Sequence, residues 1–190
     1  MIKGNFISIF NKREKMKKSL ALTSLLIVST SAMAMDVEYF IGAGAERGDI
    51  DITTSVPSIS TEYKDTALKL KAGVILDKTH RVSLSYVGYS DNGRDLDLTE
   101  LNYDYIIPLK DKFSLLAGAH LGKADYKEAG FDMDGLVYGV QTGVLYDITS
   151  NVQAELGLAY SQYNVDKTIS NIKVEFDDST SLYLGLNYKF

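Results

Sequence analysis

The sequence has no cysteine and only two prolines and two histidines among its 190 residues. Without cysteine the chain has no disulfide bond, no thiolate metal ligand and no thiol nucleophile. It also lacks a glycine-rich loop at a strand-to-helix turn that could bind phosphate. After the N-terminal segment, no apolar run reaches the roughly 20 residues that a membrane-spanning helix needs. These absences leave few residues for metal, nucleophilic or dinucleotide chemistry.

The N-terminal segment has the pattern of a secretory signal peptide. A basic segment at residues 16–18 precedes a mostly apolar run at 19–31, and small residues follow at Ala32 and Ala34. This order predicts export and cleavage after Ala34. The apolar run is too short to anchor the chain as a transmembrane helix.

We therefore divide the chain into residues 1–34, an N-terminal extension with a cleaved signal peptide, and residues 35–190, a single domain. Met1 and Met16 both remain candidate initiators, because the basic segment begins at Met16. Cleavage removes six of the 20 basic residues and one of the 25 acidic ones, which leaves 14 and 24 and a net charge of −10. This acidic balance argues against nucleic-acid binding, which depends on a basic surface.

Alternation of apolar and polar residues predicts an all-β domain. The chain ends in such a pattern, with Leu182, Leu184, Leu186, Tyr188 and Phe190 on one face. A soluble chain would leave this apolar strand as an exposed edge, whereas a closed barrel pairs its last strand with its first. Eight strands are expected, near 36–47, 65–76, 81–91, 96–107, 112–124, 135–147, 151–163 and 179–190.

The connections between these strands alternate in length. Tight turns are expected at 77–80, 108–111 and 147–150. Longer, acidic connections are expected at 48–64, 91–95, 125–134 and 164–178. Short turns at one end and long loops at the other are typical of outer-membrane barrels, whose long loops lie outside the cell.

The second face of the strands carries glycines and polar residues, which suits a narrow lumen better than a water-exposed surface. The polar lumen residues expected to form a network are Glu38, Lys69, Lys71, Asp104, His120, Gln141, Glu155 and Lys189.

Unpaired buried charges are costly, so the lumen charges should pair and plug the barrel. Glu38 should meet Lys189 at the mouth, because the first and last strands close the barrel. Lys69 and Lys71 should face Asp104 and Glu155. The alternative, a water-filled channel lined by the same charges, needs a wider barrel of about 16–18 strands.

The leader, the eight alternating strands, the turn asymmetry and the terminal Leu-Gly-Leu-Asn-Tyr-Lys-Phe together resemble the small outer-membrane β-barrel family. This family includes the OmpA transmembrane domain and OmpX type, often described as porin-like. The resemblance covers residues 35–190 and implies an eight-stranded antiparallel up-and-down barrel in the outer membrane of a Gram-negative bacterium. The implied partners are outer-membrane lipid and lipopolysaccharide, and the barrel-assembly machinery, which would recognise Leu186, Tyr188 and Phe190.

No catalytic, cofactor-binding or metal-binding residue is expected. His80 should be a solvated turn residue, and His120 a hydrogen-bonded lumen residue. We expect a non-enzymatic monomer with a structural, envelope-integrity or surface-interaction role through its acidic loops. Two alternatives stay open: a narrow passive channel for ions or small solutes, and a lipid-modifying enzyme, which would need a lipid-facing histidine and serine.

Deletion of Phe190 should impair assembly, because it removes the aromatic end of the recognised strand. We expect periplasmic accumulation and proteolysis of the unassembled chain, measured by pulse-chase and by the shift in gel mobility on heating. Lys189→Ala is the control and should assemble normally, because Lys189 faces the lumen. Normal outer-membrane levels of the Phe190 deletion would contradict the prediction.

Overall fold

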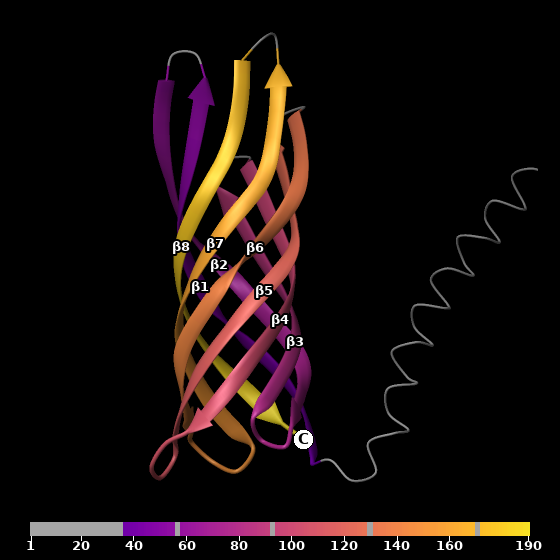
Figure 1. Cartoon of the computed structure of the whole chain (residues 1–190), viewed down its shortest axis with the longest axis vertical. Coiled ribbons are helices and arrows are strands. Elements are labelled where there is room, and N and C mark those ends of the chain that lie inside the picture. The colour runs from indigo at the N-terminus through magenta and orange to yellow at the C-terminus, as the bar shows by residue number, and fades with distance from the viewer. Residues whose placement is uncertain (1–35, 56–57, 92–93, 129–130, 170–171) are drawn as a thin grey trace, which may run out of the picture. The chain divides into compact units, whose positions relative to one another are not determined.

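The computed structural model describes residues 36–55, 58–91, 94–128, 131–169 and 172–190. Eight antiparallel strands form a closed barrel, in which each strand pairs with its neighbours in sequence and the last pairs with the first (Figure 1). The strands are β1 (Val37–Ser55), β2 (Ser58–Leu76), β3 (His80–Asp91), β4 (Arg94–Pro108), β5 (Phe113–Glu128), β6 (Phe131–Asp147), β7 (Val152–Ile169) and β8 (Ile172–Lys189).

The predicted all-β class and closed eight-stranded barrel are confirmed. The predicted signal peptide, with its cleavage site at Ala32 and Ala34 and both candidate initiators, lies outside the described residues. Within the described ranges, no helix is long and apolar enough to cross a membrane.

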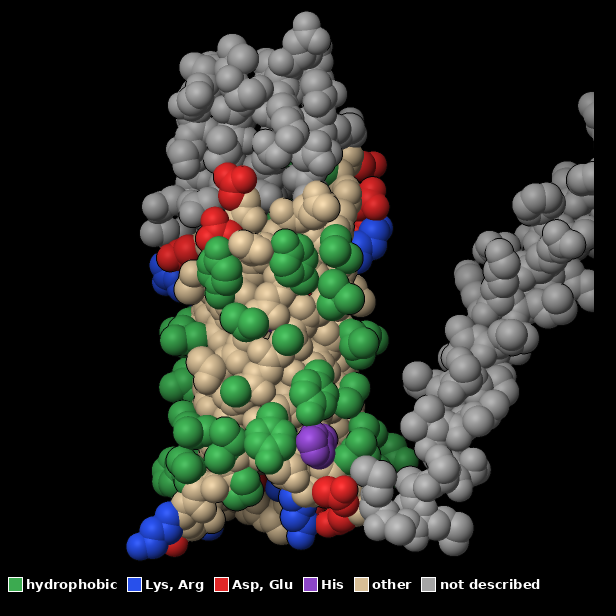
Figure 2. Space-filling model, in the orientation of Figure 1, with side chains coloured by type: hydrophobic (Ala, Val, Ile, Leu, Met, Phe, Trp, Pro, Cys, Tyr) green, Lys and Arg blue, Asp and Glu red, His purple; other side chains and the backbone are tan. Residues whose placement is uncertain are grey.

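The outward face of the middle of the barrel is apolar. Leu68 is 58% exposed and Leu184 is 60% exposed, although both are large hydrophobic side chains. Figure 2 shows hydrophobic side chains over the middle of the visible face and charged side chains near both ends. Soluble proteins rarely expose an apolar surface this continuous, whereas a barrel in a bilayer presents such a band to lipid.

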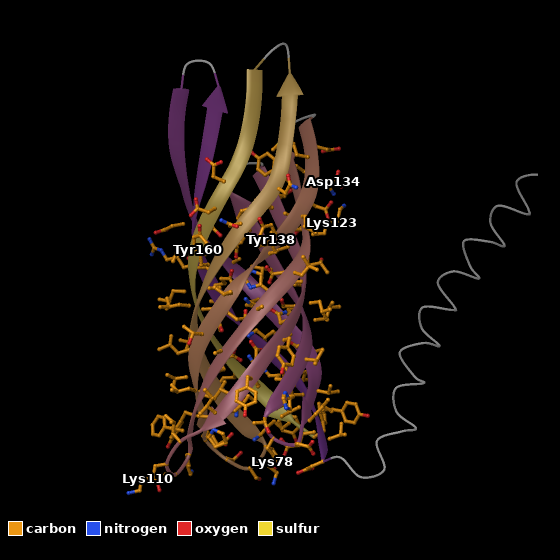
Figure 3. The ribbon with its side chains drawn as sticks, viewed as in Figure 1. Lys78, Lys110, Lys123, Asp134, Tyr138 and Tyr160 are labelled. Atoms are coloured by element: carbon orange, nitrogen blue, oxygen red, sulfur yellow. The ribbon has the colours of Figure 1, made fainter. Side chains whose placement is uncertain are left out.

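Aromatic rings border this lipid-facing band. At the turn end, the ring centroids of Phe113 and Tyr146 lie 4.8 Å apart, and those of Tyr188 and Phe190 lie 5.0 Å apart. Tyr138 lies towards the hairpin end, above the middle of the barrel (Figure 3). The backbone N–H of Phe190 also donates to the Tyr39 carbonyl oxygen at 2.9 Å, which pairs the end of the chain with the start of β1.

The predicted long connections are wrong in extent, because the strands continue through most of them. β1 and β2 each have 19 residues and pair from Val37 opposite Leu76 to Ser55 opposite Ser58. A tilted strand crosses a membrane in about 9–11 residues, so these hairpins extend well past it. Continued pairing gives the backbone groups of the extensions hydrogen-bond partners.

The polarity of the two faces reverses in these hairpin extensions. Inside, Leu96 and Met133 are buried, while their neighbours Asp95, Asp132 and Asp134 are exposed outside. The extensions therefore have the polarity of a soluble barrel, apolar inside and polar outside. A sequence pattern that expects apolar residues on the outward face does not detect strands with this reversed polarity. The apolar core here, which we call the hairpin-end layer, contains Ala67, Val87, Tyr89, Leu96, Leu98, Ala124, Met133, Val137 and Tyr163.

A second apolar cluster fills the lumen towards the turns. This turn-end layer consists of Phe40, Ile75, Ile106, Leu116 and Leu145. Each of the five has apolar, outward-facing neighbours before and after it in the sequence. Both faces of the strands are apolar at this level, so the polar part of the lumen is confined between the two apolar layers.

Leu116→Ala should lower the free energy of unfolding by about 2–5 kcal/mol, because Leu116 is 1% exposed and its truncation leaves a cavity. Urea unfolding in lipid vesicles measures the change. The control is Leu115→Ala, the adjacent outward-facing residue, where lipid can fill the space. Equal losses for the two variants would show that no packed layer surrounds Leu116.

Candidate functional site

A polar layer lies between the two apolar layers of the lumen. Along β2, the inward residues run from Ile75 through Lys71 and Lys69 to Ala67. Along β4 they run from the turn-end layer through three buried polar residues to the hairpin-end layer. The buried polar residues at this level include Glu46, Lys69, Arg81, Glu100, Asn102, Asp104, His120, Gln141, Glu155 and Asn187.

Arg81 and Glu155 join opposite walls of the barrel at the centre of this layer. The Arg81 guanidinium donates through Nη1 to Glu155 Oε2 at 2.9 Å and through Nη2 to Glu155 Oε1 at 3.0 Å. Its Nε donates to Asp104 Oδ2 at 2.8 Å. Arg81 is 1% exposed and Glu155 is 2% exposed, so the pair is shielded from solvent. We call this contact between β3 and β7 the Arg81–Glu155 brace.

Further donors complete the brace. Lys71 Nζ lies 2.7 Å from Glu155 Oε1, and Asn187 Nδ2 donates to Glu155 Oε2 at 2.9 Å. Gln141 donates to the second oxygen of Asp104. The brace thus satisfies both of its carboxylates, as groups in a low-dielectric interior require.

Several sequence-predicted partners differ in the structure. Lys71 contacts Glu155, one of the two carboxylates named for it. Lys69, however, pairs with Glu46, and Asp104 pairs with Arg81. Adjacent strands explain both differences, because Arg81 lies directly opposite Asp104 in the β3–β4 register and Glu46 lies diagonally opposite Lys69 in β1–β2.

The expected pair of Glu38 with Lys189 is also replaced. Lys189 Nζ lies 3.1 Å from Asp147 Oδ1, and Gln153 donates to the same oxygen at 2.9 Å. Both strand ends still face the mouth. The side chain of Asp147, at the end of β6, reaches Lys189 at the end of β8 across the start of β7.

Arg81, Glu46, Glu100 and Asn187 are lumen residues that the sequence reasoning did not include in the network. A signal for Arg81 was present, since it shares its parity with Ser83 and Ser85 and opposes the apolar Val82 and Leu84. Arg81 directly follows the predicted turn at 77–80, where a charged residue is usually solvated.

Glycines make room for the polar layer. The Tyr183 ring lies over Gly157, where an added Cβ would come within 2.3 Å of the Tyr183 hydroxyl. The ammonium groups of Lys69 and Lys71 each lie 4.6 Å from the Tyr183 ring centroid, at cation–π distance. Glycine at position 157 is therefore required by the shape of the polar layer.

His120 lies in the polar layer beside Ser161. Its Nε2 is 3.0 Å from Ser161 Oγ, and both side chains are buried. A serine beside a histidine can act as a nucleophile and base, but the base is usually oriented by a third group. Nδ1 of His120 has no hydrogen-bond partner among the described residues.

His80 begins β3 and is not a solvated turn residue, so that prediction is wrong. Its Nδ1 lies 2.8 Å from the Tyr103 hydroxyl, and its ring packs edge-on to Tyr105 with centroids 5.4 Å apart. The outward parity of β3 places His80 in the aromatic border of the lipid-facing band. In the part of the chain that the structure describes, no group of three or more His, Asp or Glu side chains is placed to hold a metal ion.

No family model and no curated protein matches the sequence. Among solved structures, the chain is similar to Neisserial surface protein A, NspA, with 22% identity and a TM-score of 0.60, covering 80% of this chain and 97% of that one. It is also similar to outer membrane protein H, OprH, from P. aeruginosa, with 23% identity and a TM-score of 0.56, covering 80% and 99%. The N-terminal β-barrel domain of Pseudomonas aeruginosa OprF matches with 17% identity and a TM-score of 0.51, covering 78% and 97%. Strand order, lipid-facing band and these likenesses agree: the chain has the fold of the small eight-stranded outer-membrane β-barrels.

Proposed function

We propose that this protein is a non-enzymatic barrel of the outer membrane, with a closed lumen and an acidic surface presented outside the cell. The observation that carries the proposal is the Arg81–Glu155 brace, which spans the lumen between two apolar layers. Open porins need about 16–18 strands to enclose a channel, and this barrel has eight. We propose a structural or surface-interaction role for such a closed barrel.

The packing around the brace supports a closed lumen. The cavity beside Lys71, Glu155 and Tyr183 has a volume of about 10 Å³, which is room for about one water molecule. The layer below it places the Phe40 ring 5.6 Å from the Arg81 guanidinium carbon. A hydrated ion passing through would have to displace both the ion pairs and this packed layer.

The hairpin extensions supply the surface for interaction. Exposed carboxylates on the described outer faces include Asp49, Asp95, Asp132, Asp134 and Asp177. Lys123 lies 3.3 Å from Asp134 (Figure 3). It also pairs with Asp125. The net charge of −10 for residues 35–190 favours partners that carry positive charge or bound cations.

The remaining parts of the proposal concern biogenesis and surroundings. We propose that residues 1–34 are removed on export and that the assembly machinery recognises Leu186, Tyr188 and Phe190. In the membrane, the lipid-facing band would contact outer-membrane lipid, and the hairpin extensions would meet lipopolysaccharide. The barrel would act as a monomer.

Planar-bilayer recording tests the closed lumen directly. The purified protein should give no steady pore current, because the brace and the turn-end layer leave no continuous path. Phe40→Ala combined with Arg81→Ser opens the turn-end layer and the brace, leaving the hairpin-end layer as the remaining barrier, and should raise the conductance above that of the wild-type protein. A steady current from the wild-type protein would support the alternative, a narrow passive channel.

Arg81→Met should lower the free energy of unfolding by on the order of 3–5 kcal/mol, because it leaves the buried carboxylates of Asp104 and Glu155 without their shared cation. Unfolding in lipid vesicles at neutral pH measures the change. The control is Lys123→Met, which breaks exposed ion pairs on the hairpin surface and should leave stability unchanged. Similar stability of the two variants would refute the importance given to the brace.

A further inference from the structure

The turn end of the barrel contains a cavity that is separate from the Arg81–Glu155 brace. Its volume is about 330 Å³, within the range of small-ligand sites. Ile75 and Ile106 of the turn-end layer line it from the inside, and Glu38, Asp147 and Lys189 line it near the opening. We call this cavity the turn-end cup.

The charges of the cup do not balance. Its lining contains three acids, Glu38, Asp111 and Asp147, and two bases, Lys78 and Lys189. Lys189 is engaged by Asp147 at 3.1 Å. Glu38 is half-buried, and its carboxylate forms no ion pair or hydrogen bond with the described residues.

An apolar inner wall beside a half-buried, unpaired carboxylate is complementary to a specific kind of group. A primary ammonium on an aliphatic stem can place its charge at the carboxylate and its methylene groups on the apolar surface. An ion pair gains strength when it is partly shielded from water, as it is for a carboxylate inside a cavity. The cup lies at the turn end of the barrel and is lined by charged side chains, including Glu38, Asp147 and Lys189, so its ligand arrives from the aqueous side.

We propose that the turn-end cup binds the lysine-type side chain of a peptide, with the ammonium at Glu38 and the stem against Ile75 and Ile106. Binding at this site depends on the residues that line the turn-end cup. It does not depend on whether the lumen conducts ions or on what the hairpin surface binds. It gives the barrel a second binding face, opposite the acidic hairpins.

Titration of the purified protein in nonionic detergent micelles, followed by NMR, tests the site. The probes are N-acetyl-lysine methylamide and N-acetyl-norleucine methylamide, which share an aliphatic stem and differ in the ammonium. We expect saturable binding of the lysine probe at the turn end and binding of the norleucine probe at least about tenfold weaker, which corresponds to ~1.4 kcal/mol.

Two variants distinguish binding at Glu38 from a general electrostatic attraction to the acidic barrel end. Glu38→Gln should weaken binding of the lysine probe about tenfold. Asp111→Asn removes the same charge from an exposed turn residue of the cup and should change binding by less than about threefold. The gel-mobility shift on heating checks that both variants are folded.

Three results would overturn the proposal: no saturable binding of the lysine probe, equal binding of the norleucine probe, or equal weakening by the two variants. The last would mean that the probe responds only to the overall field of the acidic barrel end. If Glu38→Gln fails to fold, the pair of probes on the wild-type protein still decides the question.

Discussion

A charged group sealed inside a narrow barrel must find its partners within the protein, and this requirement organises the lumen. At the centre of the polar layer, the Arg81–Glu155 brace supplies these partners. One guanidinium contacts both Asp104 and Glu155, and Lys71 completes Glu155 from a third strand. Because the brace joins β3 to β7, it ties strands that share no backbone hydrogen bonds. Losing one member therefore affects both walls.

The shape of the strands is fitted to this brace. Large polar and aromatic side chains need space on a neighbouring strand, and glycine provides it. His120 lies over Gly139 and Tyr183 lies over Gly157, in each case within 3 Å of where a Cβ would stand. Side chains fill the polar layer in this way, and a cavity of about 330 Å³ lies at the turn end.

The medium outside each strand changes along its length, and the side chains change with it. In the lipid-facing band, apolar residues point outward and polar residues point inward. In the hairpin extensions, the orientation reverses, with Leu96 and Met133 inside and Asp95 and Asp134 outside. One continuous set of paired strands therefore contacts lipid in its middle and water at the hairpin end. The exterior of the extensions therefore carries exposed carboxylates where the lipid-facing band carries apolar side chains.

The sequence by itself determined the class, the strand number and the lipid-facing side, because a period of two with one apolar face depends only on neighbouring residues. Tight turns, such as the one with positive φ at Asp77 and Lys78, were evident for the same local reason. Only the tertiary structure decided which charges pair. Arg81 with Asp104, Lys69 with Glu46 and Lys189 with Asp147 depend on inter-strand register and on distances across the lumen. The length of the hairpins also depends on the tertiary structure. The pattern of outward apolar residues ends where the strands leave the lipid, but the backbone pairing of the strands continues beyond that point.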